Sequence, residues 1–357
     1  MLTIHEIKPN IQAVNFCKDF LSSDPKKRYV VGKNEYSKSI ISQIEIEAII
    51  DDFTTDTTYL DKPIIKTENI PSDSLVIVAV TIYPFTIRNK LSEMNIRQLD
   101  YFAFYEHSNL DIIQVKVWAS FRKDFKNNKT KYLWVDELLA DAESKRIYNQ
   151  IINFRLSGNL AYMEGFTDRQ KQQYFEDFLD LKNEIFADVG GFDGFTSLEF
   201  IKKYPDYKAV YIFEPELENM EKVKANLAQY PNINFIQQGL SNKKQIVKFS
   251  VSGSASTISE NGTIEIQVDE LDQIVNDAIS FIKMDIEGAE GLAIEGAKQT
   301  ILKNHPKLAI SVYHKANDFW KIPEQVLSIR NDYDIYLRHY TEGVDETVMF
   351  FVPNNKM

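Results

Sequence analysis

The stretch that decides the fold is Asp188-Val189-Gly190-Gly191-Phe192-Asp193-Gly194, a glycine loop that begins with an acid. The largely apolar run Glu184–Ala187 precedes it, and an amphipathic segment from Thr196 to Lys203 follows. The run predicts a buried strand and the later segment predicts a helix. Glycines let the backbone pass close under a ligand. The sequence therefore predicts a strand, a tight loop and a helix, the unit with which open α/β folds bind cofactors.

The acid at the start of this loop indicates which cofactor it holds. Dinucleotide loops place a pyrophosphate at a helix N-terminus, and the carboxylate of Asp188 would repel that phosphate. A carboxylate suits instead the methionine ammonium of S-adenosylmethionine. Asp188 thus argues against NAD and favours a methyl transferase. The cofactor contacts predicted in this loop are Asp188, Gly190, Gly191, Phe192, Asp193 and Gly194.

Acids also follow two later strands. Glu214 comes after Ala209–Phe213, where α/β folds place the acid that binds ribose hydroxyls. The run Ser280–Met284 is followed by Asp285, Glu287 and Glu290. A lone acid at a buried strand end needs a partner, so we predict that Asp285 contacts the cofactor, whereas Glu290 could equally cap the next helix. A further strand and its loop predict adenine contacts from Gln238, Gly239 and Ser241.

Taken together, these motifs resemble those of the FkbM-type S-adenosylmethionine-dependent methyltransferases. The resemblance covers roughly Tyr174 to Pro353, and its motifs, in that family's order, are Phe186–Ser197, Ile212–Pro215, Ile282–Glu290, Ser311–Lys315 and Tyr336–Tyr340. It implies a class I, Rossmann-like fold with a mixed seven-stranded sheet. It also implies O-methylation, usually of a sugar or related hydroxyl in the assembly of surface polysaccharide, glycolipid or secondary metabolite. Composition does not indicate the acceptor.

An acceptor hydroxyl must lose its proton as it attacks, and histidine is the natural base near neutral pH. Two histidines follow apolar strands at the expected ligand edge, namely His314 and His339. We predict His314 as the base, His339 as the second candidate, and Asp285 and Glu287 as catalytic carboxylates. His314 could instead cap the next helix. Asp285, Glu287 and a histidine could also bind a divalent metal that acidifies the hydroxyl, but their spacing alone does not predict one.

Substrate contacts are predicted on both sides of the cofactor. Tyr174 could cover the ligand or pack in the core, and Lys315 and Arg338 could meet a phosphate of a nucleotide-linked sugar. The alternating segments Ile246–Val251 and Thr263–Val268 predict extra strands at the substrate side. The loop Ser252–Ser259 between them could gate the acceptor.

A chain of 357 residues exceeds what one core usually holds. We predict an N-terminal Rossmann-like α/β domain over 1–108, a helical connector over 109–180 and the methyltransferase domain over 181–357. The first turn of the N-terminal domain, Gly32–Ser37, keeps one glycine of the usual three. We therefore assign it no nucleotide, which disfavours a nicotinamide-dependent oxidation. This domain could instead pack against its neighbours or pair the chain as a homodimer.

The remaining composition restricts the class of protein. A net charge of −11 disfavours nucleic acid and an anionic membrane surface. The single Cys17 excludes an internal disulfide, and Met1–Asn10 has no secretion signal. No apolar stretch is long enough to cross a bilayer, so we expect a cytoplasmic enzyme with a small-molecule or glycan acceptor. The alternative is an inactive methyltransferase-like scaffold in glycan biosynthesis, which the intact carboxylates disfavour.

Overall fold

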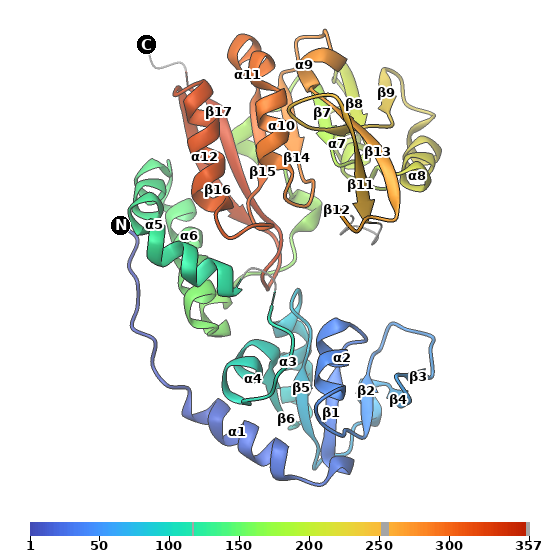
Figure 1. The fold of residues 1–357 in the computed structure, drawn as a ribbon, viewed down its shortest axis with the longest axis vertical. Helices are drawn as coiled ribbons and strands as arrows, with labels where there is room; N and C mark the ends of the chain where they lie inside the picture. The colour runs from blue at the N-terminus through green and yellow to red at the C-terminus, as the bar shows by residue number, and fades with distance from the viewer. Residues whose placement is uncertain (116–117, 251–256, 355–357) are drawn as a thin grey trace.

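The computed structural model describes residues 1–115, 118–250 and 257–354 (Figure 1). Two α/β units are joined by a helical segment, and strands of both units run toward the region between them. Of the loop predicted over Ser252–Ser259, residues 252–256 lie outside the described residues, so its gating role stays a prediction. Within the described part of the chain, no helix is both long and apolar enough to cross a membrane.

The N-terminal unit is a six-stranded sheet in the order β3-β4-β2-β1-β5-β6, parallel except for the β3–β4 pair. Its strands are β1 (Arg28–Val31), β2 (Ala48–Ile50), β3 (Thr58–Tyr59), β4 (Lys62–Ile65), β5 (Leu75–Val78) and β6 (Arg97–Asp100). Its helices are α1 (Ile11–Ser22), α2 (Glu35–Ile41), α3 (Pro84–Glu93) and α4 (Tyr101–His107). The apolar residue Ile44, which precedes β2, is not part of that strand. Its N–H donates to the carbonyl of Ile40 at the end of α2.

The connecting segment consists of α5 (Trp118–Leu138), α6 (Ala142–Ser157) and three short 3-10 turns. It packs on the C-terminal unit, since the N–H of Ala140 donates to the carbonyl of Ile335 at 2.8 Å. The N-terminal arm lies beside α5 in Figure 1, where the N–H of Leu2 donates to Asp136 at 2.7 Å. Both ends of the N-terminal unit are thus tied to the connector. The predicted boundaries at residues 108 and 180 stay predictions.

The C-terminal unit is a seven-stranded mixed sheet in the order β16-β17-β15-β14-β7-β8-β9. Its strands are β7 (Ile185–Val189), β8 (Ala209–Phe213), β9 (Ile233–Ile236), β14 (Phe281–Met284), β15 (Lys307–Ser311), β16 (Tyr333–His339) and β17 (Thr347–Pro353). Only β17 pairs antiparallel with its neighbours, β15 and β16. The predicted α/β fold with a mixed seven-stranded sheet is therefore confirmed.

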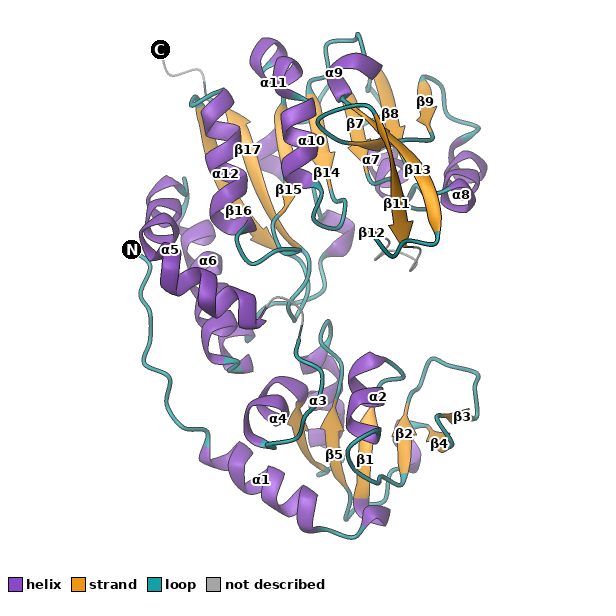
Figure 2. Ribbon diagram, viewed as in Figure 1, coloured by secondary structure: helices purple, strands orange, loops and turns teal. Residues whose placement is uncertain are grey.

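Helices cover both faces of this sheet (Figure 2). They are α7 (Phe195–Lys203), α8 (Leu217–Leu227), α9 (Leu271–Ile274), α10 (Glu290–Gly296), α11 (Lys298–Asn304) and α12 (Asp318–Ile329). In Figure 2, α10, α11 and α12 lie in front of the sheet and α7 lies behind it. The rings of Phe186, Phe200 and Phe281 fill the space under α7, with centroids 4.5–6.2 Å apart. Their burial supplies part of the hydrophobic free energy that holds α7 on the sheet.

A second, four-stranded sheet in the order β10-β13-β11-β12 lies beside the first. It is formed by β10 (Gly239–Leu240), β11 (Gln245–Ser250), β12 (Thr257–Ile258) and β13 (Ile264–Asp269). The two strands predicted from alternating segments are β11 and β13, which pair antiparallel. They do not join the main sheet but form a wall next to the carboxyl ends of its strands.

Candidate active site

The glycine loop after β7 lies too close to two neighbouring strands to admit side chains. Gly190 has φ +88°, and a Cβ built on it would lie 2.1 Å from the carbonyl oxygen of Asp285. A Cβ on Gly191 would lie 2.4 Å from Cγ2 of Ile212. The loop therefore needs glycine both for its backbone angle and for this close approach. Gly194 precedes α7, and the Asp193 carboxylate accepts from the N–H of Phe195 at 3.0 Å, so the side chain of Asp193 caps that helix.

Asp188 is fully buried at the end of β7 and lines neither of the cavities described below. Its Oδ1 lies 3.0 Å from Nζ of Lys283, and its Oδ2 accepts from the hydroxyl of Ser197 at 2.7 Å. Lys283 also donates to the carbonyl of Gly190 at 2.6 Å. In this structure, a contact with Lys283 thus replaces the predicted direct contact between Asp188 and a methionine ammonium. The pair instead fixes the glycine loop.

The sequence analysis did not single out Lys283, although a signal was present. A lysine inside the apolar strand Phe281–Met284 must have a partner once it is buried. The charge of Asp188, one strand away, is that partner, because Lys283 and Asp188 are opposite each other in the β14–β7 register.

The first cavity lies between the carboxyl ends of β7, β8 and β14 and the four-stranded sheet. It is lined by Glu214 at one side and by apolar residues of the second sheet, Leu240, Phe249, Ile258, Ile266 and Val268. The carboxylate of Glu214 accepts from the N–H of Phe192 and of Glu216, each at 2.9 Å. Burial raises the pKa of Glu214 to about 7, against the lowering effect of these two donors.

Adenine contacts were predicted from Gln238, Gly239 and Ser241. Of these three residues, only Gly239 lines the cavity. Gln238 donates its side-chain amide to Gln267 at 3.3 Å, and Ser241 is buried where its carbonyl packs under Gly296. Gln238 and Ser241 do not line this cavity, so their contacts with the cofactor stay predictions.

A second, more polar cleft has a volume of about 380 Å³ and lies on the other side of the glycine loop. The residues that line both cavities are Gly190, Phe192, Asp285 and Glu287. The two spaces therefore meet at the end of β14. The second cleft is also lined by Gln170, Lys171, Gln173, Tyr174, Lys283, Tyr313 and Glu346.

Asp285 stands at the junction of the two cavities. The hydroxyl of Tyr174 donates to its Oδ2 at 2.6 Å, and the hydroxyl of Tyr313 donates to Oδ1 at 3.4 Å. Burial would raise the pKa of Asp285, but the charges of His314 and Lys283 outweigh it and hold this pKa below its usual value. Tyr174 adopts φ +71°, a left-handed conformation that is costly for a bulky residue. Tyr174 lines the cleft and also belongs to a buried apolar cluster, so its contact with a substrate stays a prediction.

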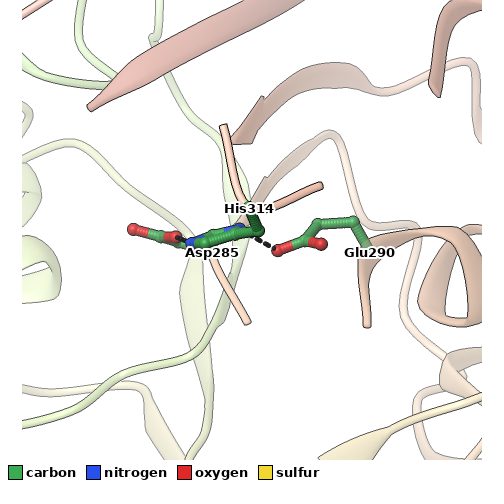
Figure 3. Close-up of side chains that lie close together, drawn as sticks. All are labelled: Asp285, Glu290 and His314. Carbon is green, nitrogen blue, oxygen red and sulfur yellow. Dashed lines mark ion pairs between the residues drawn. The ribbon is translucent and has the colours of Figure 1, made fainter. Parts of the chain in front are cut away.

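His314 lies in a cage of carboxylates. Its Nε2 is 3.3 Å from Asp285 and 3.7 Å from Glu287, and its Nδ1 is 2.9 Å from Glu290. Figure 3 shows the imidazole between the carboxylates of Asp285 and Glu290. Burial would lower the pKa of His314, but these acids raise it to about 10. At neutral pH the ring is an imidazolium with both nitrogens engaged, so it is not the lone free base that the sequence predicts.

The carboxylates and the imidazole of this cluster are also the groups that could bind a divalent metal. Ligand atoms of Asp285, Glu290 and His314 lie within 4.8 Å of one another. However, Asp285 and Glu290 face opposite nitrogens of the ring, so the imidazolium itself stands between them and balances their charge. The geometry gives no separate reason for a divalent cation here.

Three other predicted residues do not reach either cavity. His339 is buried against Phe166, with Nδ1 2.9 Å from the hydroxyl of Thr347, and burial lowers its pKa to about 3. Arg338 lies 2.7 Å from Asp141 and ties β16 to the start of α6. Lys315 donates to the carbonyl of Gly288 and lines a separate depression beside α5. In this structure His339, Arg338 and Lys315 thus have other partners, and their predicted roles as base and phosphate ligands stay predictions.

Comparison with known proteins agrees with this geometry. Residues 188–341 match the model of the methyltransferase FkbM domain. This part of the chain is therefore similar to the methyltransferase FkbM domain. No curated protein sequence matches the chain.

Solved structures show how far the fold extends. A methyltransferase FkbM from Methylobacillus flagellatus KT is 23% identical, with a TM-score of 0.73 over 97% of this chain and 94% of that one. The fold is thus shared over nearly the whole length, including the N-terminal unit. Lower likeness is found to a precorrin-6y C5,15-methyltransferase from Geobacter metallireducens GS-15, at 13% identity and a TM-score of 0.32, over 53% of this chain and 93% of that one.

Proposed function

We propose that this protein is an S-adenosylmethionine-dependent O-methyltransferase. The observation that carries the proposal is the junction at Asp285 and Glu287 between an apolar cavity and a polar cleft. A cofactor with its nucleoside in the first space and its methyl group at the junction would present that methyl to a molecule in the second.

The residues of the first cavity fit the cofactor. Glu214 offers carboxylate oxygens at the end of β8, where ribose hydroxyls are bound in this kind of fold. The side chains of Phe249, Ile258 and Ile266 form apolar surface suited to a flat base. Gly190 and Gly191 let the loop pack closely against β14 and β8, and the backbone of this loop borders the cavity and the cleft, so the methionine part can lie against it. The bound cofactor supplies an activated methyl group, and the protein supplies alignment and charge.

The charges at the junction also suit this cofactor. S-adenosylmethionine carries a sulfonium and an ammonium, and Asp285 and Glu287 face the shared space with negative charge. Their attraction to a cation is strong in a partly buried site, where the effective dielectric constant is low. Transfer of the methyl group removes the sulfonium charge, which favours release of the product.

The acceptor side is suited to a molecule rich in hydroxyls. Gln173, Tyr174, Tyr313 and Glu346 give the cleft amide, phenol and carboxylate groups that can hydrogen-bond a polyol. We therefore propose a sugar or sugar-derived acceptor. A nucleotide-linked sugar is less favoured as the acceptor. The two residues predicted to bind its phosphates, Arg338 and Lys315, are engaged elsewhere.

Calorimetric titration tests this proposal. Wild type should bind S-adenosylmethionine and S-adenosylhomocysteine but not NADH. Glu214→Ala should weaken both by about 10–100-fold, since hydrogen bonds to a charged group contribute about 1.5–3 kcal/mol each. Glu218→Ala is the matched control, because Glu218 lies in the first turn of the following helix, α8, with its side chain 77% exposed. A wild type that binds neither methionine derivative would refute the proposal and favour the scaffold alternative.

A further inference from the structure

An acceptor hydroxyl in the second cleft needs a group that takes its proton, and His314 is poorly placed for that task. Both of its nitrogens face carboxylates. The cleft contains another carboxylate, that of Glu346, which was not among the predicted site residues. The inference drawn from it rests on the proposed function.

Glu346 is held at the edge of the cleft by the sheet itself. β17 runs antiparallel to β15, so its start lies beside the carboxyl end of β15, at the edge where the parallel strands end. Glu346 directly precedes β17 and has φ +68°, a conformation that is costly for a residue with a side chain. Tyr174, Phe192 and Glu287, which also line the cleft, have positive φ as well.

The side chain is oriented by a chain of hydrogen bonds. The amide of Gln173 donates to Oε2 of Glu346, and also to the hydroxyl of Tyr174 at 2.9 Å. Tyr174 in turn donates to Asp285 at the junction. Among the described residues, no donor reaches the second oxygen of Glu346, Oε1. One oxygen is thus positioned and the other is left for a ligand in the cleft.

We propose that Glu346 is the catalytic residue that accepts the proton of the acceptor hydroxyl. The acceptor oxygen forms a bond to the methyl carbon while the bond from that carbon to sulfur breaks. The electron pair of the broken bond goes to sulfur, which becomes a neutral thioether. The hydroxyl proton moves to Glu346, so that charge and atoms balance without another reactant.

The surroundings of Glu346 place its proton affinity in a useful range. Burial raises the pKa of Glu346 to about 8, with Asp285 and Asp345 adding to the rise and Gln173 and His314 opposing it. Tyr174, Tyr313 and, from the N-terminal unit, Tyr83 are also near it. The other charged groups that line the same cleft are Lys171, Asp193, Glu199, Lys283 and Glu287. A cationic cofactor at the junction would favour the carboxylate form. A base whose pKa is near the working pH is the most effective one.

Infrared difference spectra across pH 6–10 test the proposal without an acceptor. Wild type should show a protonated carboxyl that titrates with a midpoint near 8, the pKa given by burial. Glu214, with a pKa of about 7, contributes a second carboxyl band, so the comparison is made in the Glu214→Gln background. In that background Glu346→Gln should lack the band that titrates near 8, and the exposed Glu260→Gln should keep it. A Glu214→Gln spectrum without such a band, or a band near 8 that survives in the double variant with Glu346→Gln, would overturn the proposal.

Methyl transfer from S-adenosylmethionine to a panel of methyl glycosides provides the second readout. Glu346→Gln should bind the cofactor as wild type does but lose kcat by about 100-fold or more, the usual range for a general base. Glu346→Asp should restore part of the rate. If wild type is active and Glu346→Gln keeps its kcat and pH profile, this proposal fails while the proposed function stands. If wild type binds no cofactor, the proposed function itself fails.

Discussion

The buried pair of Lys283 and Asp188 allows a prediction whose size follows from the structure. The side chains are 3% and 0% exposed and 3.0 Å apart. Lys283→Met keeps the volume but leaves Asp188 charged and without its cation. Removal of one partner of a buried ion pair costs about 3–5 kcal/mol, because the remaining charge is uncompensated.

This loss should appear in thermal unfolding followed by circular dichroism. At about 2–4 °C per kcal/mol for a unit of this size, Lys283→Met should lower the melting temperature by about 6–20 °C. The double variant Asp188→Asn, Lys283→Met should recover much of the loss. A single variant that melts within 2 °C of wild type, or a double variant that equals the sum of the singles, would refute the reasoning.

Three further predictions follow from other contacts. Because the pKa of Glu214 is raised to about 7 and ribose hydroxyls donate to its ionised form, affinity for S-adenosylhomocysteine should increase from pH 6 to pH 8, and calorimetry on Glu214→Gln should show no such increase. Gly190→Ala should abolish this binding, because its Cβ would lie 2.1 Å from the carbonyl of Asp285, whereas Gly165→Ala, at φ +90° with no atom within 4 Å, should bind normally. Glu342 accepts from the N–H of Thr86 at 2.8 Å at the start of α3, so Glu342→Ala should increase amide hydrogen exchange in the first turn of α3, and unchanged exchange there would contradict this cap.

Local features of the sequence were sufficient to predict the strand, loop and helix around Gly190, whereas the mixed sheet was predicted from the family resemblance. The apolar periods and the glycines act over a few residues, where sequence and structure are directly linked. The partner of Asp188 lies 95 positions later at Lys283, and only the β7–β14 pairing brings the two together. Such a contact depends on the order of the strands in the sheet, which the spacing of apolar residues along the sequence does not specify.

Strand order also separates His314 and His339, the two histidines predicted as candidate bases. Both follow a strand, but β17 is inserted between β15 and β16, so His339 ends up two strands away from His314. The same insertion brings the start of β17, with Glu346, to the cleft. An antiparallel strand carries its first residue to the edge where parallel strands end, so a search limited to residues after strands could not find Glu346.

The most direct test of the account is a crystal structure of the protein with S-adenosylhomocysteine. The account predicts that the ribose hydroxyls lie within hydrogen-bond distance of Glu214 and that the sulfur lies at the junction beside Asp285, facing the cleft that contains Tyr174 and Glu346. A ligand bound elsewhere, or one whose sulfur faces away from that cleft, would contradict it.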